Sequence, residues 1–178
     1  MSLHVAVNEH DQRQGNINAP LVLVEYGDYE CPHCGAAYPV VKQLQKDFGG
    51  RLLFVFRNFP LSEMHPHAVA AARVAEAAAL QKKFWEAHDS IFEHQEDLSS
   101  YSLLRYAKAA GTDVKKLVTD MNSDRIINKV DSDIESGVRS GVNGTPTFFI
   151  NGQRHDSYYD YDVLKSALER KLESELKR

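Results

Sequence analysis

Two short hydrophobic runs near the start of the chain predict a pair of buried strands. Leu21–Tyr26 and Arg51–Phe56 are nearly continuous stretches of β-branched, aromatic and other hydrophobic residues, which is the pattern of strands buried on both faces. Between them, hydrophobic residues recur at helical spacing at Ala36, Ala37, Val40, Val41, Leu44 and Phe48. Gly49-Gly50 ends this helix. A strand, a helix and a strand in this order predict two parallel neighbours joined by a right-handed crossover.

The middle of the chain is helical, and its end returns to strands. Hydrophobic stripes at helical spacing lie in 66–80, 84–92, 103–107, 114–121 and 126–138. Thr147–Ile150 then precedes Asn151-Gly152, a strong two-residue hairpin signal, so the last two strands should pair antiparallel. A final helix follows, with Asp160 as its expected N-cap. We therefore predict one α/β domain over residues 1–178, with a helical insertion at about 60–141.

Composition and charge exclude several classes of protein. The 178 residues are 43% hydrophobic and 26% charged, which is the balance of a globular domain. The net charge is -4 and no Lys/Arg cluster is longer than a pair, so we expect no nucleic-acid partner. No hydrophobic run approaches the roughly 18 residues of a membrane span, so we expect no integral membrane segment. The first residues lack the hydrophobic core of a secretion signal, which predicts a cytoplasmic location; the alternative is a periplasmic or secreted protein whose signal has been removed.

The two cysteines, Cys31 and Cys34, are the most informative residues of the composition. Two cysteines cannot form a disulfide scaffold or a four-cysteine zinc site within one chain. A three-residue spacing would arise by chance in roughly 1% of random placements, so a joint role is the starting hypothesis. They lie where a strand meets a helix N-terminus, with Pro32 in the first turn, where proline is tolerated. Redox chemistry fits this context best; a zinc-binding or partner-docking module that uses the pair is the alternative.

The order of these features resembles a known family. A strand, Cys31-Pro32-His33-Cys34 at a helix start, a crossover strand, a helical insertion and Gly144–Thr147 before a hairpin together resemble the DsbA-like branch of the thioredoxin superfamily. Three further segments carry the likeness, at 25–34, 57–61 and 83–89. The resemblance covers nearly the whole chain. It implies a thioredoxin-like fold, in which a mixed central sheet is flanked by helices.

The same resemblance implies a thiol-disulfide oxidoreductase with no cofactor beyond its own redox-active disulfide. Its partners would be protein dithiols or disulfides, or small thiols such as glutathione, together with a recycling redox partner. Glutathione-using transferases and isomerases share the fold and form an alternative, but they usually lack the second cysteine, so Cys34 argues against them. Whether the centre oxidises or reduces its substrates is left open by the sequence.

Disulfide exchange assigns different tasks to the residues of the Cys-Pro-His-Cys motif. Cys31 is the expected nucleophile, an exposed thiolate stabilised by the unpaired N–H groups and the positive end of the helix dipole. Cys34, one turn further along, is the expected resolving thiol. A positive charge on His33 should lower the thiolate pKa further and favour an oxidant. The alternative for His33 is a solvated turn residue with no electronic effect.

Three residues outside the motif complete the predicted site. Glu25 stands six residues before Cys31, where the family places a buried acid; we expect a raised pKa and a proton relay to Cys34, unless the side chain reaches solvent from the strand end. Pro146 matches the family's cis-proline opposite the cysteines, which leaves backbone groups free to pair with a substrate. Thr145 stands where the periplasmic oxidases that name the family usually carry valine. This difference weakens any transfer of their redox strength.

Overall fold

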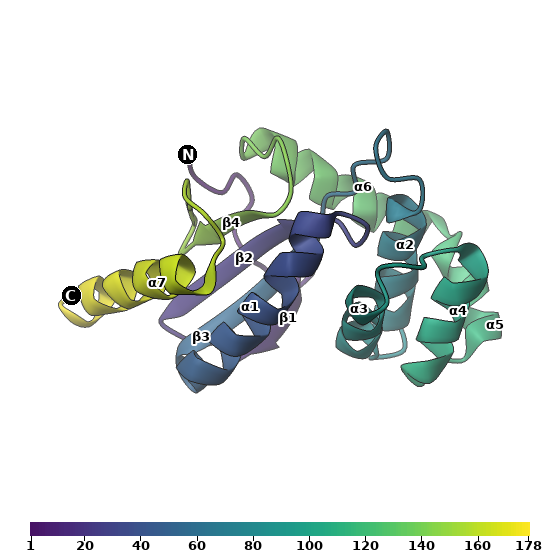
Figure 1. Cartoon of the computed structure of the whole chain (residues 1–178), viewed down its shortest axis with the longest axis horizontal. Coiled ribbons are helices and arrows are strands. Elements are labelled where there is room, and N and C mark those ends of the chain that lie inside the picture. Colours follow the sequence, from purple (N-terminus) through teal and green to yellow (C-terminus); the bar gives the residue numbers. More distant parts are fainter.

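The computed structural model describes residues 1–178, which form a five-stranded mixed sheet flanked by helices (Figure 1). The strands lie in the order β1-β3-β2-β4-β5. They are β1 (Gln12–Gly15), β2 (Leu21–Gly27), β3 (Leu52–Asn58), β4 (Thr147–Ile150) and β5 (Gln153–Arg154). β2 and β3 are parallel, with Leu21 opposite Leu52, and the other neighbours are antiparallel. The predicted thioredoxin-like fold is confirmed.

Five of the seven α-helices lie between β3 and β4. The helices are α1 (Pro32–Phe48), α2 (Ala68–Ala79), α3 (Phe84–Glu93), α4 (Ser100–Ala109), α5 (Val114–Met121), α6 (Asp124–Arg139) and α7 (Tyr161–Leu176), with a short 3₁₀ turn at Gly49–Arg51. In Figure 1, α2 to α5 form a group beside the sheet, and α6 leads from that group back towards β4. None of these helices is both long and apolar enough to cross a membrane.

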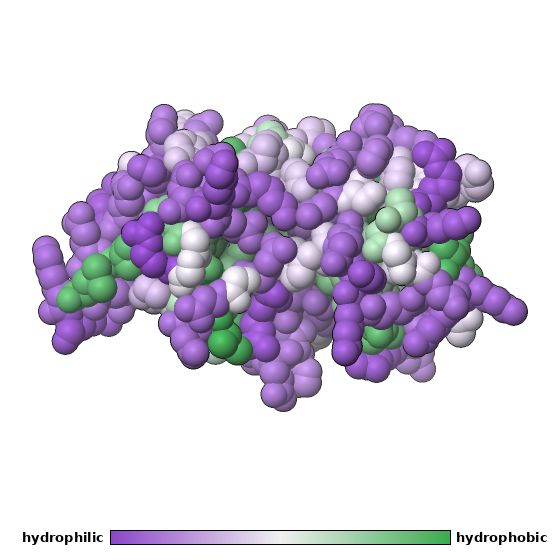
Figure 2. Space-filling model, turned by 90° about the horizontal axis from the view of Figure 1, so that it is seen from below, coloured by the Kyte–Doolittle hydropathy of each residue, from purple (hydrophilic) through white to green (hydrophobic).

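The sheet separates two hydrophobic layers of unequal size. Leu23, Phe54 and Phe56 belong to the larger layer, which is formed with α1, α7 and the helices of the insertion. Val24 and Val55 belong to the smaller layer, against the N-terminal segment and α6. On the face drawn in Figure 2, most of the surface is polar, and hydrophobic side chains occur in separate small groups. Alternating residues of the buried strands therefore serve opposite layers, as expected for strands covered on both faces.

Some local features differ from the sequence-based expectations. β1 was not predicted, because its sequence Gln-Arg-Gln-Gly has no hydrophobic pattern; pairing with β3 at the edge of the sheet makes it a strand. The alanine-rich helix begins at Ala68 rather than at Pro66. Asp160 is the N-cap residue of α7 as predicted, although its side chain makes no capping hydrogen bond. Val138 belongs to the predicted stripe on α6 and yet is 60% exposed, because this end of the helix packs through Gly137, against Phe59 and Tyr26, instead.

Candidate redox site

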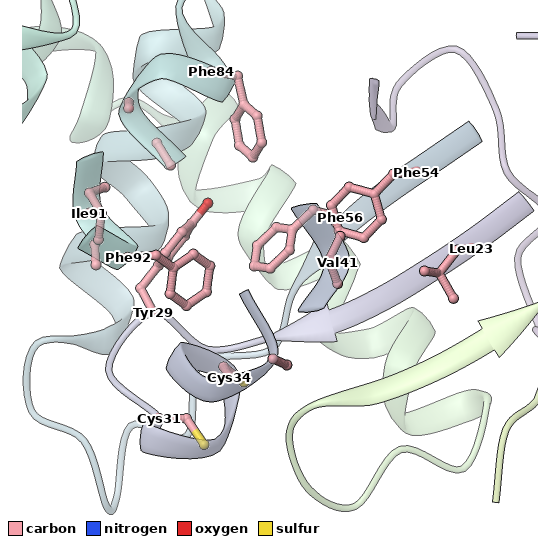
Figure 3. Packing of buried hydrophobic residues seen from close by; sticks show 14 of the residues in the cluster. Leu23, Tyr29, Cys31, Cys34, Val41, Phe54, Phe56, Phe84, Ile91 and Phe92 are labelled. Atoms are coloured by element: carbon pink, nitrogen blue, oxygen red, sulfur yellow. The ribbon is translucent and has the colours of Figure 1, made fainter. Parts of the chain in front are cut away.

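Cys31 and Cys34 lie at the end of α1 that follows β2, at the edge of the larger hydrophobic layer (Figure 3). Cys31 is the N-cap residue in an extended conformation, and Pro32 begins the helix. Both cysteines are free thiols in this structure. Cys34 is fully buried, and Cys31 is only 4% exposed. The expectation of a freely exposed nucleophile is therefore wrong, because the neighbouring backbone and the cis-proline segment enclose the sulfur.

The two thiols differ sharply in acidity. The pKa of Cys31 is lowered to about 5, first by a hydrogen bond with the Cys34 thiol and then, against the effect of burial, by the Thr145 side chain and the backbone N–H groups of Cys34 and His33. Burial, reinforced by the hydrogen bond to Cys31, raises the pKa of Cys34 well above its ordinary value. Near neutral pH the pair therefore carries one negative charge, on Cys31.

Glu25 lies in the interior beneath the cysteines. Its side chain is 3% exposed, which excludes the alternative in which it reaches solvent. Burial raises the pKa of Glu25 to about 8, with a smaller contribution from the negative charge of Cys31. Its Oε1 atom has no hydrogen-bond partner. A buried carboxyl group with a free oxygen and a pKa near neutrality is chemically suited to give or take a proton.

The His33 imidazole turns away from the interior. The residue is exposed, and its Nδ1 atom lies 2.9 Å from the hydroxyl of Tyr159, in the loop before α7. Towards Cys31, His33 presents its backbone N–H. The predicted electrostatic role of the imidazole stays a prediction, since the hydrogen bonds around Cys31 are the leading causes of its low pKa.

The segment before β4 closes the site on the opposite side. The peptide bond between Thr145 and Pro146 is cis, as the resemblance implied. The Cys31 thiol lies 3.5 Å from the carbonyl oxygen of Thr145, to which it donates. The Thr145 hydroxyl is buried with no partner apart from this sulfur. The structure thus brings together the two cysteines and the Thr-Pro pair, which are separated by more than 100 residues in the sequence.

Polar contacts of the active-site turn were missed by the sequence analysis. Asp28 is buried, and its Oδ2 atom accepts hydrogen bonds from the N–H of Leu61 at 2.9 Å and from His65 Nδ1 at 2.8 Å. Although burial opposes it, the bond to Asp28 raises the pKa of His65. Gln95 donates to the backbone carbonyls on either side of Glu30. No local motif marks these partners, because each comes from a distant part of the chain.

Fold and site together define a thioredoxin-fold protein with two neighbouring cysteines at the start of α1. A family model described as thioredoxin matches residues 7–170. BdbD from Bacillus subtilis, in its oxidised form, is 26% identical, with a TM-score of 0.83 over 93% of this chain and 94% of that one. The thiol-disulfide exchange protein α-DsbA2 from Wolbachia pipientis is 26% identical, with a TM-score of 0.82 over 92% and 88%. The chain belongs to the DsbA-like family of thiol-disulfide oxidoreductases in the thioredoxin superfamily.

Curated relatives place a similar segment in a larger protein. The Na(+)/H(+) antiporter NhaA 1 of Mycolicibacterium vanbaalenii is 45% identical over 163 residues, which are 90% of this chain and 26% of the antiporter. The chain thus spans about a quarter of the length of the curated relatives it matches. The cytoplasmic location predicted from the sequence is wrong, because it conflicts with the DsbA-like family, which is named after periplasmic oxidases; the periplasmic alternative fits better.

Proposed function

We propose that residues 1–178 act as one catalytic domain that oxidises dithiols of substrate proteins outside the cytoplasm. The observation that carries this proposal is the contrast between Cys31, with a pKa of about 5, and the buried Cys34, whose pKa is raised. Each unit by which the Cys31 pKa lies below the ambient pH stabilises the reduced form, and makes the disulfide a stronger oxidant by roughly 30 mV. This site needs no cofactor, because the sulfur pair itself carries the two electrons.

The reaction proceeds in two exchanges. A substrate thiolate attacks Cys31 of the Cys31–Cys34 disulfide, so that a substrate–Cys31 bond forms and Cys34 leaves with the electron pair. The protonated carboxyl group of Glu25 gives its proton to the Cys34 sulfur. The second substrate thiolate then attacks the substrate sulfur of the mixed disulfide and expels Cys31 as a stable thiolate. The substrate gains a disulfide and the centre gains two electrons, which a recycling redox partner later removes.

Cys31 and the segment before β4 contact the substrate in this proposal. Thr145 lies against the Cys31 sulfur, followed by the cis-proline Pro146, and backbone groups of this segment can pair with an extended substrate chain. A small thiol such as glutathione would use the same sulfur without this pairing. We therefore expect protein dithiols to react faster than glutathione at equal concentrations of thiolate.

The redox equilibrium of the pair against glutathione buffers tests this function, with zinc content measured on the same sample. We expect a reversible two-electron transition at a potential well above that of a cytosolic reductant. A strongly negative potential would indicate a reductant, and bound zinc without a transition would indicate the metal-binding alternative. Cys31→Ser and Cys34→Ser should each abolish dithiol oxidation, because neither variant can form the Cys31–Cys34 disulfide. In Cys34→Ser, the Cys31 thiolate should still attack a disulfide of an oxidised substrate, displace one substrate thiolate and stay in a mixed disulfide that no second thiol of the centre can resolve. Normal turnover by Cys31→Ser would refute the mechanism.

A further inference from the structure

Gln95 connects the helical insertion to the active-site turn. It lies between α3 and α4, and its Nε2 atom donates to the carbonyl oxygen of Tyr29 at 2.9 Å and to that of Cys31 at 2.7 Å. A side-chain amide has two N–H bonds, and here both end on carbonyls of the same turn. The backbone on each side of Glu30 is thus held by one side chain, which lies 66 residues after Tyr29 and 64 residues after Cys31 in the sequence.

Gly35 provides the space that this amide occupies. A Cβ atom at position 35 would lie 2.2 Å from Oε1 of Gln95 and 2.8 Å from its Cδ. The backbone of Gly35 is helical, so its conformation does not require glycine. The reason for a glycine in the first turns of α1 is therefore the close approach of Gln95. The N–H of Gly35 also donates to the carbonyl of Cys31, at 3.0 Å, so this carbonyl has two donors.

The backbone around Gln95 is itself held in place by α4. The imidazole of His94 stacks on the ring of Tyr106, with centroids 4.8 Å apart and planes 19° apart. The Tyr106 hydroxyl donates to the carbonyl of Asp97 at 2.7 Å. Residues on both sides of Gln95 are thus attached to one side chain of α4. The amide therefore acts from a supported position rather than from a free loop.

The position of the turn decides how well Cys31 is stabilised. The turn ends at Cys31, the N-cap of α1, so its position sets how the first N–H groups of the helix face the sulfur. The N–H groups of His33 and Cys34 help to lower the pKa of Cys31, and such interactions weaken steeply with small changes of distance and angle. We propose that Gln95 is a positioning residue, which holds the Tyr29–Cys31 turn so that the N–H groups of α1 point at the reacting sulfur. This inference rests on the proposed function and adds that the helical insertion controls the reactivity of the centre.

Four variants test this role, and each is compared with the wild-type protein. Gln95→Ala removes both hydrogen bonds, and Gly35→Ala pushes the amide away. We expect each to raise the apparent pKa of Cys31, followed by thiolate absorbance, and to shift the glutathione equilibrium about tenfold towards the disulfide. In the double variant the methyl group added at position 35 meets no amide, so both shifts should equal those of Gln95→Ala alone. Gln81→Ala is the matched control.

Gln81 also makes two side-chain hydrogen bonds to backbone, both with Asp113 at the other end of the insertion. Gln81→Ala should lower the unfolding midpoint about as much as Gln95→Ala, with the redox equilibrium and Cys31 pKa unchanged. If Gln95→Ala left both redox readouts within twofold of the wild type, or if the shifts in the double variant were additive, Gln95 would not be a positioning residue. A wild-type protein with no redox transition would instead refute the proposed function itself.

Discussion

The molecule buries ionisable groups in two regions, and these regions differ in how many of the groups have hydrogen-bond or ion-pair partners. At the redox centre, Glu25 is buried with one oxygen unpaired, beside a cysteine whose pKa is lowered to about 5. At the beginning of β1 and the end of β3, a second set of polar groups, all buried except the half-buried Lys129, forms the ion-pair cluster of Asp11, Arg57, Asn58, Glu76, Lys129 and Asp133. Groups in both regions are buried, so the redox centre and the ion-pair cluster differ in whether their buried groups have partners.

Nearly all polar groups of the ion-pair cluster have a hydrogen-bond or ion-pair partner. Arg57 makes two hydrogen bonds to Asp11, at 2.8 and 2.9 Å, and Lys129 pairs with Asp133 at 2.6 Å. The Asn58 amide donates to Asp133 and to Glu76. A cavity of about 750 Å³ lies over this cluster, and neither cysteine lines it. This cavity is therefore separate from the reacting sulfur, and the paired charges around it hold the N-terminal segment, α2 and α6 together.

The largest expected effect concerns the redox centre, where we predict an unusually high reactivity of the Cys31 thiolate. With a pKa of about 5, Cys31 is mostly thiolate at pH 6, whereas an ordinary cysteine is well under 1% thiolate there. We expect Cys31 in the reduced protein to be alkylated with a midpoint near pH 5, and about a hundredfold faster at pH 6 than in the unfolded chain. Cys34 should not react in this pH range, because it is buried and its pKa is raised. A midpoint near 9 in the folded protein would mean that the turn does not stabilise the thiolate.

The next largest effect is expected from Arg57→Met, which breaks the ion-pair cluster and leaves the redox centre intact. It leaves Asp11 buried without its partner, so the free energy of unfolding should fall by about 3–5 kcal/mol. Denaturant unfolding measures this loss, and Arg139→Met, at an exposed ion pair, should cost less than about 1 kcal/mol. The glutathione equilibrium of the folded protein should not change. A large change in it would show that the two regions are coupled.

Glu25→Gln should change the pH dependence of stability in the reduced protein. The pKa of Glu25 is raised in the folded state from 4.5 to about 8, so the folded state keeps a proton that the unfolded chain loses between these values. Its ionisation therefore lowers stability as pH rises from 4.5 to 8. Glutamine removes this loss, so the variant should resemble the wild type at pH 5 and exceed it by a few kcal/mol at pH 8. Glu63→Gln, at an exposed position, serves as the control.

The smallest effect is expected at the exposed rim of the redox centre. Tyr159→Phe removes the hydroxyl that holds His33, and a solvent-exposed hydrogen bond contributes only about 0.5–1.5 kcal/mol. Dithiol oxidation should therefore slow by about two- to threefold. Tyr158→Phe changes a neighbouring ring that is 77% exposed, and should leave the rate unchanged. Equal rates for all three proteins would show that the orientation of His33 does not matter.

Much of the fold follows from local pattern. β2, β3 and β4 are strands where hydrophobic runs predicted them, and the Asn151-Gly152 turn joins β4 to β5 as expected. β1 could not be found in this way, since its four residues become a strand only through pairing with β3. The same distinction holds in the site. The Cys31–Cys34 spacing indicated the chemistry, but nothing near Gln95 or Tyr159 in the sequence indicates their contacts with the motif.

The sequence by itself determined the chemical groups of this protein: two cysteines at the start of a helix, an acid six residues before them and a Thr-Pro pair before a late strand. These are properties of short segments, in which spacing and propensity are sufficient. The tertiary structure decided how the groups behave. It encloses Cys31, buries Glu25 with an unpaired oxygen and brings Gln95 onto the turn. Burial and hydrogen bonding set pKa values, and both depend on neighbours that folding brings from distant parts of the chain.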